Sequence, residues 1–429
     1  QYLMTVGPHG HYWLNLIKER EKIGAGADTD ITPIKLKGKW TSIFNKDYKV
    51  ILEKDRLPRF LESRSWFYGN AGKIRSIFIR RIIPLDRKKY QNYVFVFADI
   101  IFTSAKKESF LFPVALIHRD ESDLSEQELA QHALVNLIVN NNEYVIIDAI
   151  QEKTFGQAMI KILTQRRRFS NDYSDLIIRK SKFYKHVINN SETTFFQRDL
   201  KFCRHQSQLI FENEFRLKFY HCVEDGKNPE SELAKFLTDN VHFENIPRFV
   251  SELQLNRGQS EPFECVMLQK IVHSEGDAWT MVQDGIGQYF DRVLARNIDI
   301  NDAGVKKYRL LNGEFEDIPE VMHELLNSFQ MEQLYLLGKR TAELHRALAS
   351  SYTKPEFRPE MFSKLYQRAL YQTMRTTASK GFSALQKVIL DLDDSVKIRA
   401  EELLSKKQEI IQCFKEILKI KITAMKIRV

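Results

Sequence analysis

The spacing of apolar positions predicts strands in the first third of the chain. Short runs rich in Ile, Val and Phe, separated by polar turns, are typical of β-strands. Several are apolar over five or more consecutive residues, which indicates a sheet covered on one or both faces. Helical spacing appears at 55–67, and 123–141 is predicted to be an interrupted helix with an acidic start. The predicted strands are 73–85, 93–103, 109–117 and 143–150.

Further along, the pattern is mixed and then becomes helical. We predict a helix at 154–169, a hairpin at 203–215 with its turn near Glu212–Glu214, and a strand at 263–272. After Asp277, apolar residues recur every three or four positions. The predicted helices are 278–297, 319–350, 359–392 and 395–422, and the alternating residues 423–429 could begin a strand.

The stretch "FRLKFYHCVEDGKNPESELAKFL" (215–237) changes period partway through. Strand alternation gives one face to Phe215, Leu217 and Phe219 and the other to Arg216, Lys218 and Tyr220. Asn228 and Pro229 then suit a helix start, because Asn caps free N–H groups and Pro fits the first helical position. Glu232 lies in the first turns of that helix.

A strand lysine paired with a helix glutamate is the arrangement that holds nucleotide phosphates in kinases. Lys218 and Glu232 are the candidates for this pair. The same residues also suit a simpler interpretation, because strand lysines are commonly solvated and acidic residues favour helix N-termini. No G-x-G-x-x-G run precedes the strand.

Composition narrows the class of protein. A chain of 429 residues predicts two or three domains, and 43% hydrophobic with 28% charged residues is typical of a globular protein. No apolar run approaches the roughly 18 residues of a membrane span. The start lacks the pattern of a secretory signal, and the four cysteines form no CxxC motif. We therefore expect a cytoplasmic protein with reduced thiols and no membrane partner.

The net charge of +9 raises the question of whether the protein binds nucleic acid. The basic clusters at 80–81, 87–89 and 166–168 are small, and no zinc finger or basic zipper is present. Binding of anionic phosphates explains the excess charge equally well. A nucleic-acid partner is therefore not expected.

Five segments, in order, resemble the maltokinases, a family of aminoglycoside phosphotransferase-like kinases. The resemblance extends from about Leu57 to Val429. The segments are "SWFYGNAGKIRSIFI" (65–79), "LKFYHCVEDGKNPESELAKFL" (217–237), "HSEGDAW" (273–279), "LLGKRTAELHRALAS" (336–350) and "YQRALYQTMR" (366–375).

The resemblance implies an α+β, protein-kinase-like fold. Its parts would be an α+β N-terminal cap at 30–152, a β-rich N-lobe at 153–272 and a partial helical C-lobe at 273–429. It also implies transfer of the γ-phosphate of ATP to the anomeric hydroxyl of maltose, giving maltose 1-phosphate, with Mg²⁺ as the metal.

The resemblance implies roles for four residues. Lys218 would contact the nucleotide phosphates and Glu232 would be its partner. Residues 268–272 would form the hinge beside the adenine, with Gln269 and Ile271 as the contacts.

The first residues, "LMTVGPHGHYWLNL" (3–16), resemble the closing strand of a trehalose synthase. Residues 1–22 would then be the terminal strand of a preceding α-amylase-like domain. This implies a bacterial trehalose synthase–maltokinase fusion that serves trehalose and glucan (glycogen) metabolism, with the preceding domain as a partner in the same polypeptide.

The chain also departs from the family pattern. Neither the His-Gly-Asp catalytic loop nor the Asp-Phe-Glu metal segment occurs in it. The expected Glu-Gln-Ser-Asn-like run is also replaced by "RHQSQLIFENEF" (204–215). The catalytic base and the Mg²⁺ ligands are expected beyond Val429, so this chain alone should be inactive as a kinase. The alternative is a non-catalytic nucleotide-binding or interaction module.

Overall fold

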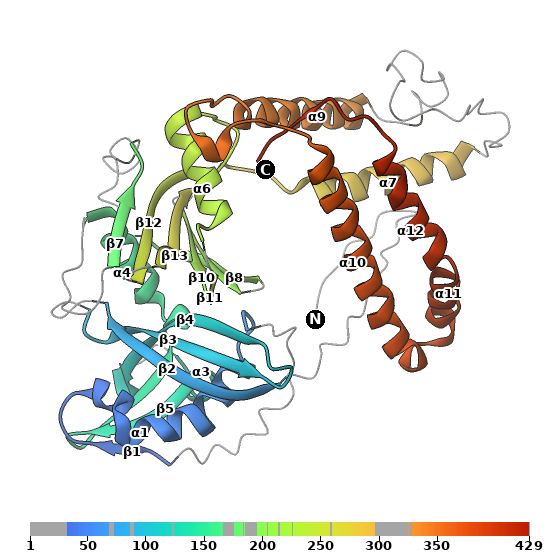
Figure 1. The fold of residues 1–429 in the computed structure, drawn as a ribbon. Coiled ribbons are helices and arrows are strands. Elements are labelled where there is room, and N and C mark those ends of the chain that lie inside the picture. Colours follow the sequence, from blue (N-terminus) through green and yellow to red (C-terminus); the bar gives the residue numbers. More distant parts are fainter. Residues whose placement is uncertain are drawn as a thin grey trace. The chain divides into compact units, whose positions relative to one another are not determined.

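The computed structural model divides the chain into two compact units, Gln1–His273 and Ser274–Val429 (Figure 1). The predicted terminal strand at 1–22 and the basic clusters at 87–89 and 166–168 lie outside the described residues. The structure describes residues 32–67, 73–85, 90–121, 124–165, 176–182, 184, 195–203, 205–212, 215–224, 226–257, 260–296, 325 and 328–428.

The first sheet of the N-terminal unit has the strand order β1-β5-β6-β4-β3-β2, with β11 paired to β4 outside this path. Neighbouring strands are antiparallel except β1 and β5. The strands are β1 (Ile34–Leu36), β2 (Ile74–Pro84), β3 (Tyr93–Phe102), β4 (Lys107–His118), β5 (Ala133–Val139), β6 (Asn142–Asp148) and β11 (Cys222–Val223). The helices around it are α1 (Lys46–Ile51), α2 (Leu57–Glu62) and α3 (Glu126–His132).

The second sheet is antiparallel, with the order β7-β12-β13-β10-β9-β8. Its strands are β7 (Leu176–Lys180), β8 (Gln197–Cys203), β9 (Gln206–Phe211), β10 (Phe215–Tyr220), β12 (Arg248–Arg257) and β13 (Ser260–Lys270). Two helices accompany it, α4 (Lys153–Gln165) and α6 (Pro229–Phe236). Helix α6 contacts β12 (Figure 1).

Periodicity predicted most of these elements. The four early strands are confirmed as β2, β3, β4 and β6, and the predicted hairpin is confirmed as β9 and β10. The prediction for 123–141 was wrong in its second half. Helix α3 ends at His132, and Ala133–Val139 forms strand β5 between β1 and β6. The run "LVNLIV" has the β-branched residues and the alternation that a covered sheet accommodates.

The two sheets share one hydrophobic core. Phe95 of the first sheet, Phe219 of the second and Phe155 of α4 all belong to it, and each is fully buried. A second core, which includes Phe60 and Trp66, lies among the first sheet and the helices around it. The first sheet therefore packs on both of its faces; its long apolar runs had predicted cover on one face or on both.

One continuous segment joins the two sheets. After β10 the chain continues directly through His221 into β11, which pairs with β4 of the first sheet. The Leu111 N–H donates to the His221 carbonyl at 2.8 Å, and the His221 N–H donates to the His205 carbonyl at 2.8 Å. The strand that carries Lys218 is thus fixed to the first sheet at its carboxyl end.

The described part of the C-terminal unit is helical, apart from a short strand pair formed by β14 (Glu360–Met361) and β15 (Met425–Lys426). The strand predicted at 423–429 is confirmed over Met425–Lys426. The helix predicted at 395–422 is interrupted near Lys406. Among the described residues, no helix has the length and apolar character needed to cross a bilayer. The helices are α7 (Ala278–Arg296), α9 (Ser328–Leu348), α10 (Lys364–Val388), α11 (Asp394–Ser405) and α12 (Lys407–Lys415).

Candidate functional site

Lys218 lies in the middle of β10, with β9 on one side and β13 on the other. Alternation sends Leu217 and Phe219 into the shared core and Lys218 to the opposite face, as the sequence predicted. That face is covered by helix α6, so Lys218 is only 8% exposed. A nearly buried ammonium group requires a partner to offset its desolvation.

Helix α6 begins as the sequence predicted. The Asn228 side chain accepts a hydrogen bond from the Glu230 N–H at 3.0 Å, and Pro229 occupies the first helical position. The Asn228 N–H donates to Glu264 Oε2 at 3.0 Å, which ties the helix start to strand β13. Both bonds fix the helix start, and with it the direction of the first side chains.

The structure pairs Lys218 with Glu230 rather than with Glu232. Lys218 Nζ donates to Glu230 Oε1, whereas Glu232 forms an ion pair with Lys227 at 3.8 Å. The assignment of Glu232 as the partner was therefore wrong. Two residues along a helix turn the side chain by roughly 200°, so only one of these glutamates can face the strand lysine.

Glu230 is held by three side chains from the sheet. Besides Lys218, Tyr220 donates from its hydroxyl to Glu230 Oε2 at 2.9 Å, and Gln206 Nε2 donates to the same oxygen at 3.3 Å. Burial, and then the charge of Glu230, raise the pKa of Tyr220, so its hydroxyl remains a donor. The carboxylate is thereby oriented even though its side chain is 43% exposed.

Two further carboxylates lie beneath α6. Glu252 of β12 accepts from the Ser231 hydroxyl and lies 3.6 Å from the Lys235 ammonium. Burial raises the pKa of Glu264, with repulsion from Glu252 acting in the same direction and the Asn228 N–H acting against it. By strand register, this face of the sheet therefore carries Glu252 and Glu264 together with the cations Lys218, Arg216 and Arg179.

The predicted hinge overlaps the end of β13. Gln269 pairs with Arg216 on one side and Phe249 on the other, so its backbone groups point towards neighbouring strands. Residues 268–270 thus belong to β13, and their role beside an adenine stays a prediction. Ile271 is the first residue after the strand and stays a candidate adenine contact.

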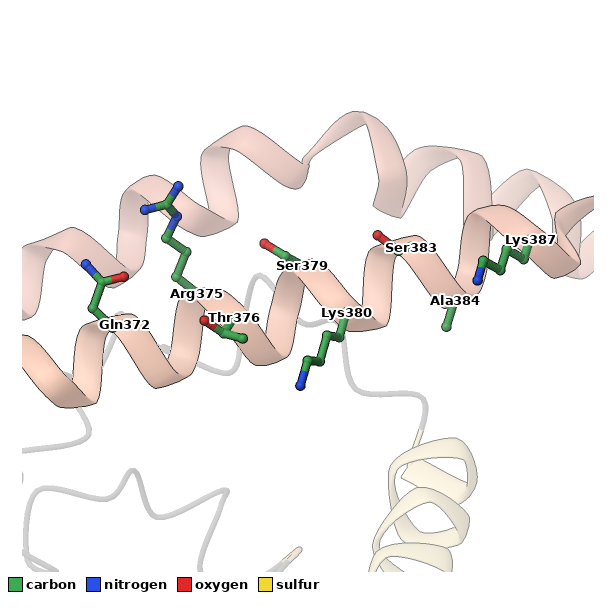
Figure 2. Close-up of a pocket in the computed structure, with 8 residues that line it drawn as sticks. All are labelled: Gln372, Arg375, Thr376, Ser379, Lys380, Ser383, Ala384 and Lys387. Carbon is green, nitrogen blue, oxygen red and sulfur yellow. The ribbon is translucent and has the colours of Figure 1, made fainter. Parts of the chain in front are cut away.

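A hollow of about 610 Å³ lies along α10 in the C-terminal unit (Figure 2). All of its lining side chains come from this one helix, so no second helix or strand encloses it. It includes none of the sequence-predicted site residues. The lining residues are Gln372, Arg375, Thr376, Ser379, Lys380, Ser383, Ala384 and Lys387.

In the part of the chain that the structure describes, no group of three or more His, Cys, Asp or Glu side chains is placed to hold a metal ion. We therefore assign no Mg²⁺ ligand within these residues. Cys203, Cys222, Cys265 and Cys413 are all free thiols.

Sequence reasoning missed Glu230, Tyr220 and Gln206. A signal for Glu230 was present, because the Asn-Pro start makes it the first acidic residue of the helix. The roles of Tyr220 and Gln206 depend on how α6 is rotated over the sheet, which the local sequence does not encode.

No protein-family model matches the chain, and no curated protein matches it. Among solved structures, it is similar to a glucosamine kinase in complex with glucosamine, ADP and inorganic phosphate. The identity is 12% and the TM-score 0.44, over 86% of this chain and 64% of that one. Two further crystal forms of glucosamine kinase, A and B, give 13% and 12% identity and TM-scores of 0.41 and 0.42, each over 80% of this chain and 58% of that chain.

The chain thus spans less than two thirds of the length of these kinases. Their identities and TM-scores are too low to establish a shared fold or a shared activity. The mixed α+β architecture itself is evident from the two sheets and the helical unit.

Proposed function

We propose that the N-terminal unit binds the phosphates of ATP through Lys218, with Glu230 as the residue that positions the ammonium group. The observation that carries the proposal is the nearly buried strand lysine held by a carboxylate at the start of α6. A kinase uses this pair to place a positive charge on the α- and β-phosphates. The backbone of Lys218 is fixed in strand β10, and its ammonium group is oriented by the carboxylate of Glu230.

The sequence resemblance extends the proposal to the whole reaction. Residues 30–152 would be the cap, 153–272 the N-lobe and 273–429 part of the helical C-lobe of a kinase-like fold. The substrate would be maltose, phosphorylated to maltose 1-phosphate as part of a trehalose synthase fusion. The chemistry would need a base and Mg²⁺ ligands that we do not assign among the described residues, so binding is the activity to test first.

The direct test is nucleotide-dependent thermal stability. ATP at about 100 times its Kd adds about 2.7 kcal/mol to the stability of a protein that binds it only when folded. We expect Lys218→Met to weaken ATP binding by about tenfold or more, because a hydrogen bond to a charged group contributes about 1.5–3 kcal/mol. Melting curves with and without ATP, in the presence and absence of Mg²⁺, measure the effect.

Lys201→Met is the matched control. Lys201 lies on β8 of the same sheet, and its side chain is 62% exposed and near Asp199. This variant should keep the full ATP-induced shift in melting temperature. If ATP stabilises both variants as it does the parent, or stabilises none of the three proteins, the assignment of Lys218 fails.

Turnover separates the kinase from the alternative of a non-catalytic module. A polypeptide extended to include a His-Gly-Asp loop should form maltose 1-phosphate from ATP and maltose. ATP binding without phosphoryl transfer in that extended protein would support the module.

A further inference from the structure

Helix α10 is cationic along its whole length. Its 25 residues include lysines and arginines but no aspartate or glutamate. Among the described residues, the ion pairs of the C-terminal unit involve other cations, such as Arg340, Lys406 and Lys419, and none on α10. The charges of α10 are therefore free to attract an external anion. They are Lys364, Arg368, Arg375, Lys380 and Lys387.

The hollow along α10 contains three of these cations and a row of uncharged polar side chains (Figure 2). At about 100° per residue, the members of the row lie within about 60° of one another around the helix. Arg375 lies on one side of the row, and Lys380 and Lys387 lie on the other side. All three cations are exposed. We call these cations and the row the cationic face; the row is Gln372, Thr376, Ser379 and Ser383.

The chemistry of the cationic face limits its partner. Of the described side chains that line the hollow, all are polar or charged except Ala384. A protein partner normally requires aromatic or aliphatic anchors, and a helix that lies on a membrane requires an apolar side. The hollow offers neither among its described lining residues. Arginine, lysine, serine, threonine and glutamine side chains are the usual donors to the phosphates of nucleic acids.

A base-paired duplex suits the cationic face better than a single strand. Proteins that bind single strands stack the bases on aromatic side chains, and no aromatic side chain is among the described residues that line the hollow. A duplex keeps its bases inside and carries a phosphate about every 3.4 Å along each strand. The distance along α10 from Gln372 to Lys387 is about 22 Å, so one strand presents several phosphates to the three cations.

We propose that the cationic face of α10 binds the phosphate backbone of a nucleic-acid duplex, without contacts to the bases. The proposal does not depend on the proposed ATP site. It revises the expectation that nucleic acid is not a partner, which rested on small clusters of adjacent cations. Arg375, Lys380 and Lys387 are five and seven residues apart, and only the helix brings them to one side.

Fluorescence anisotropy of the full chain with a labelled DNA duplex, measured at several NaCl concentrations, tests the proposal. The logarithm of the affinity changes with the logarithm of the salt concentration with a slope of about −0.9 for each phosphate contacted. Three contacts therefore contribute about −2.7 to the slope, or about a 40-fold loss of affinity between about 50 and 200 mM salt. Arg375→Gln, Lys380→Gln and Lys387→Gln together should remove this contribution.

The matched control combines Arg340→Gln, Lys406→Gln and Lys419→Gln. It removes the same net charge from the same unit, but each of these cations is paired with a glutamate, at 2.7, 2.6 and 2.7 Å. This control should keep the slope of the parent.

Two single variants complete the test. Ser383→Glu adds a carboxylate to the row and should weaken duplex binding by itself, which gives an independent result if the triple variant does not fold. Lys218→Met should bind the duplex as the parent does, because the proposed ATP site is not involved.

The outcomes that would overturn the proposal are distinct. A parent protein that does not bind the duplex, or that binds it with a slope near zero, would do so. Equal losses in the two triple variants would do so as well, because net charge alone would then explain the binding. Tighter binding of polyglutamate than of the duplex would assign the face to an acidic protein segment instead. None of these outcomes changes the test of Lys218 with ATP, so the two proposals can fail separately.

Discussion

At the scale of single residues, the oxygens of Glu230 receive donors from Lys218, Tyr220 and Gln206, whereas Glu232 is paired with Lys227. We expect Glu230→Gln to weaken ATP binding by about tenfold, because a neutral amide no longer orients the ammonium group by charge. Glu232→Gln removes the same charge two residues away and should leave ATP affinity close to that of the parent. Titration calorimetry of both variants measures the difference, and equal losses would show that only the net charge of the helix start matters.

The prediction of Glu232 in place of Glu230 as the partner of Lys218 shows what the local sequence does not determine. Alternation placed Lys218 on the correct strand face, and the Asn-Pro pair placed the helix start correctly. The choice between two glutamates depends on how α6 is rotated about its axis over the sheet. That rotation is set by long-range bonds such as those from Asn228 to Glu264 and from Ser231 to Glu252.

At the scale of elements, the segment β10–β11 connects the two sheets through a buried histidine. The His221 ring stacks on Trp66 with the ring centroids 3.8 Å apart, donates from Nδ1 to the Leu111 carbonyl at 3.2 Å and accepts from the Ser207 hydroxyl at 2.7 Å. Burial is the main cause that lowers the pKa of His221, to about 3. The ring is therefore neutral in the folded protein at neutral and mildly acidic pH.

The lowered pKa of His221 predicts how stability depends on pH. In the unfolded chain a histidine has a pKa of about 6.5, so below that pH the unfolded state binds a proton that the folded state does not bind. The free energy of unfolding should fall by up to about 1.4 kcal/mol per pH unit as the pH decreases below about 6.5, which amounts to about 2 kcal/mol at pH 5.

The test compares His221→Asn with the parent in urea unfolding near pH 7.5 and pH 5. The variant should be less stable at both values, because it loses the stack on Trp66, but its stability should change less between them. His273→Asn is the control, since His273 is exposed and should leave the pH dependence as it is in the parent. The same pH dependence in His221→Asn would show that other groups cause it.

The elements also show the limits of periodicity. The early strands were predictable because apolar runs in a sheet covered on both faces are distinctive. The strand β5 within 123–141 was not predictable in this way. A true helix start, with a capping box at Ser125 and Glu128, precedes it, and apolar residues follow from helix α3 into β5. Pairing with β1 and β6, which comes from distant parts of the chain, decides between helix and strand there.

At the scale of the whole molecule, the two units differ in how they bury their apolar side chains. In the N-terminal unit, β3 and β13 carry many fully buried residues. In the C-terminal unit, α7 and α12 have no buried side chain among the described residues, and Trp279 is 73% exposed. The order of α+β, β-rich and helical regions was predictable from periodicity, but this contrast in burial was not, because amphipathic spacing does not say whether a partner covers the apolar side.

The contrast in burial predicts two classes of hydrogen exchange. Amides in regions with few buried apolar contacts open at low free-energy cost, whereas core strands open only near the cost of global unfolding. We expect amides of β3 and β13 to exchange over hours and those of α7 and α12 to exchange orders of magnitude faster. Peptide-level mass spectrometry after deuterium labelling measures both classes in one sample, so each unit is a control for the other. Exchange in α7 as slow as in β13 would contradict the prediction, because a helix without buried side chains opens at low free-energy cost.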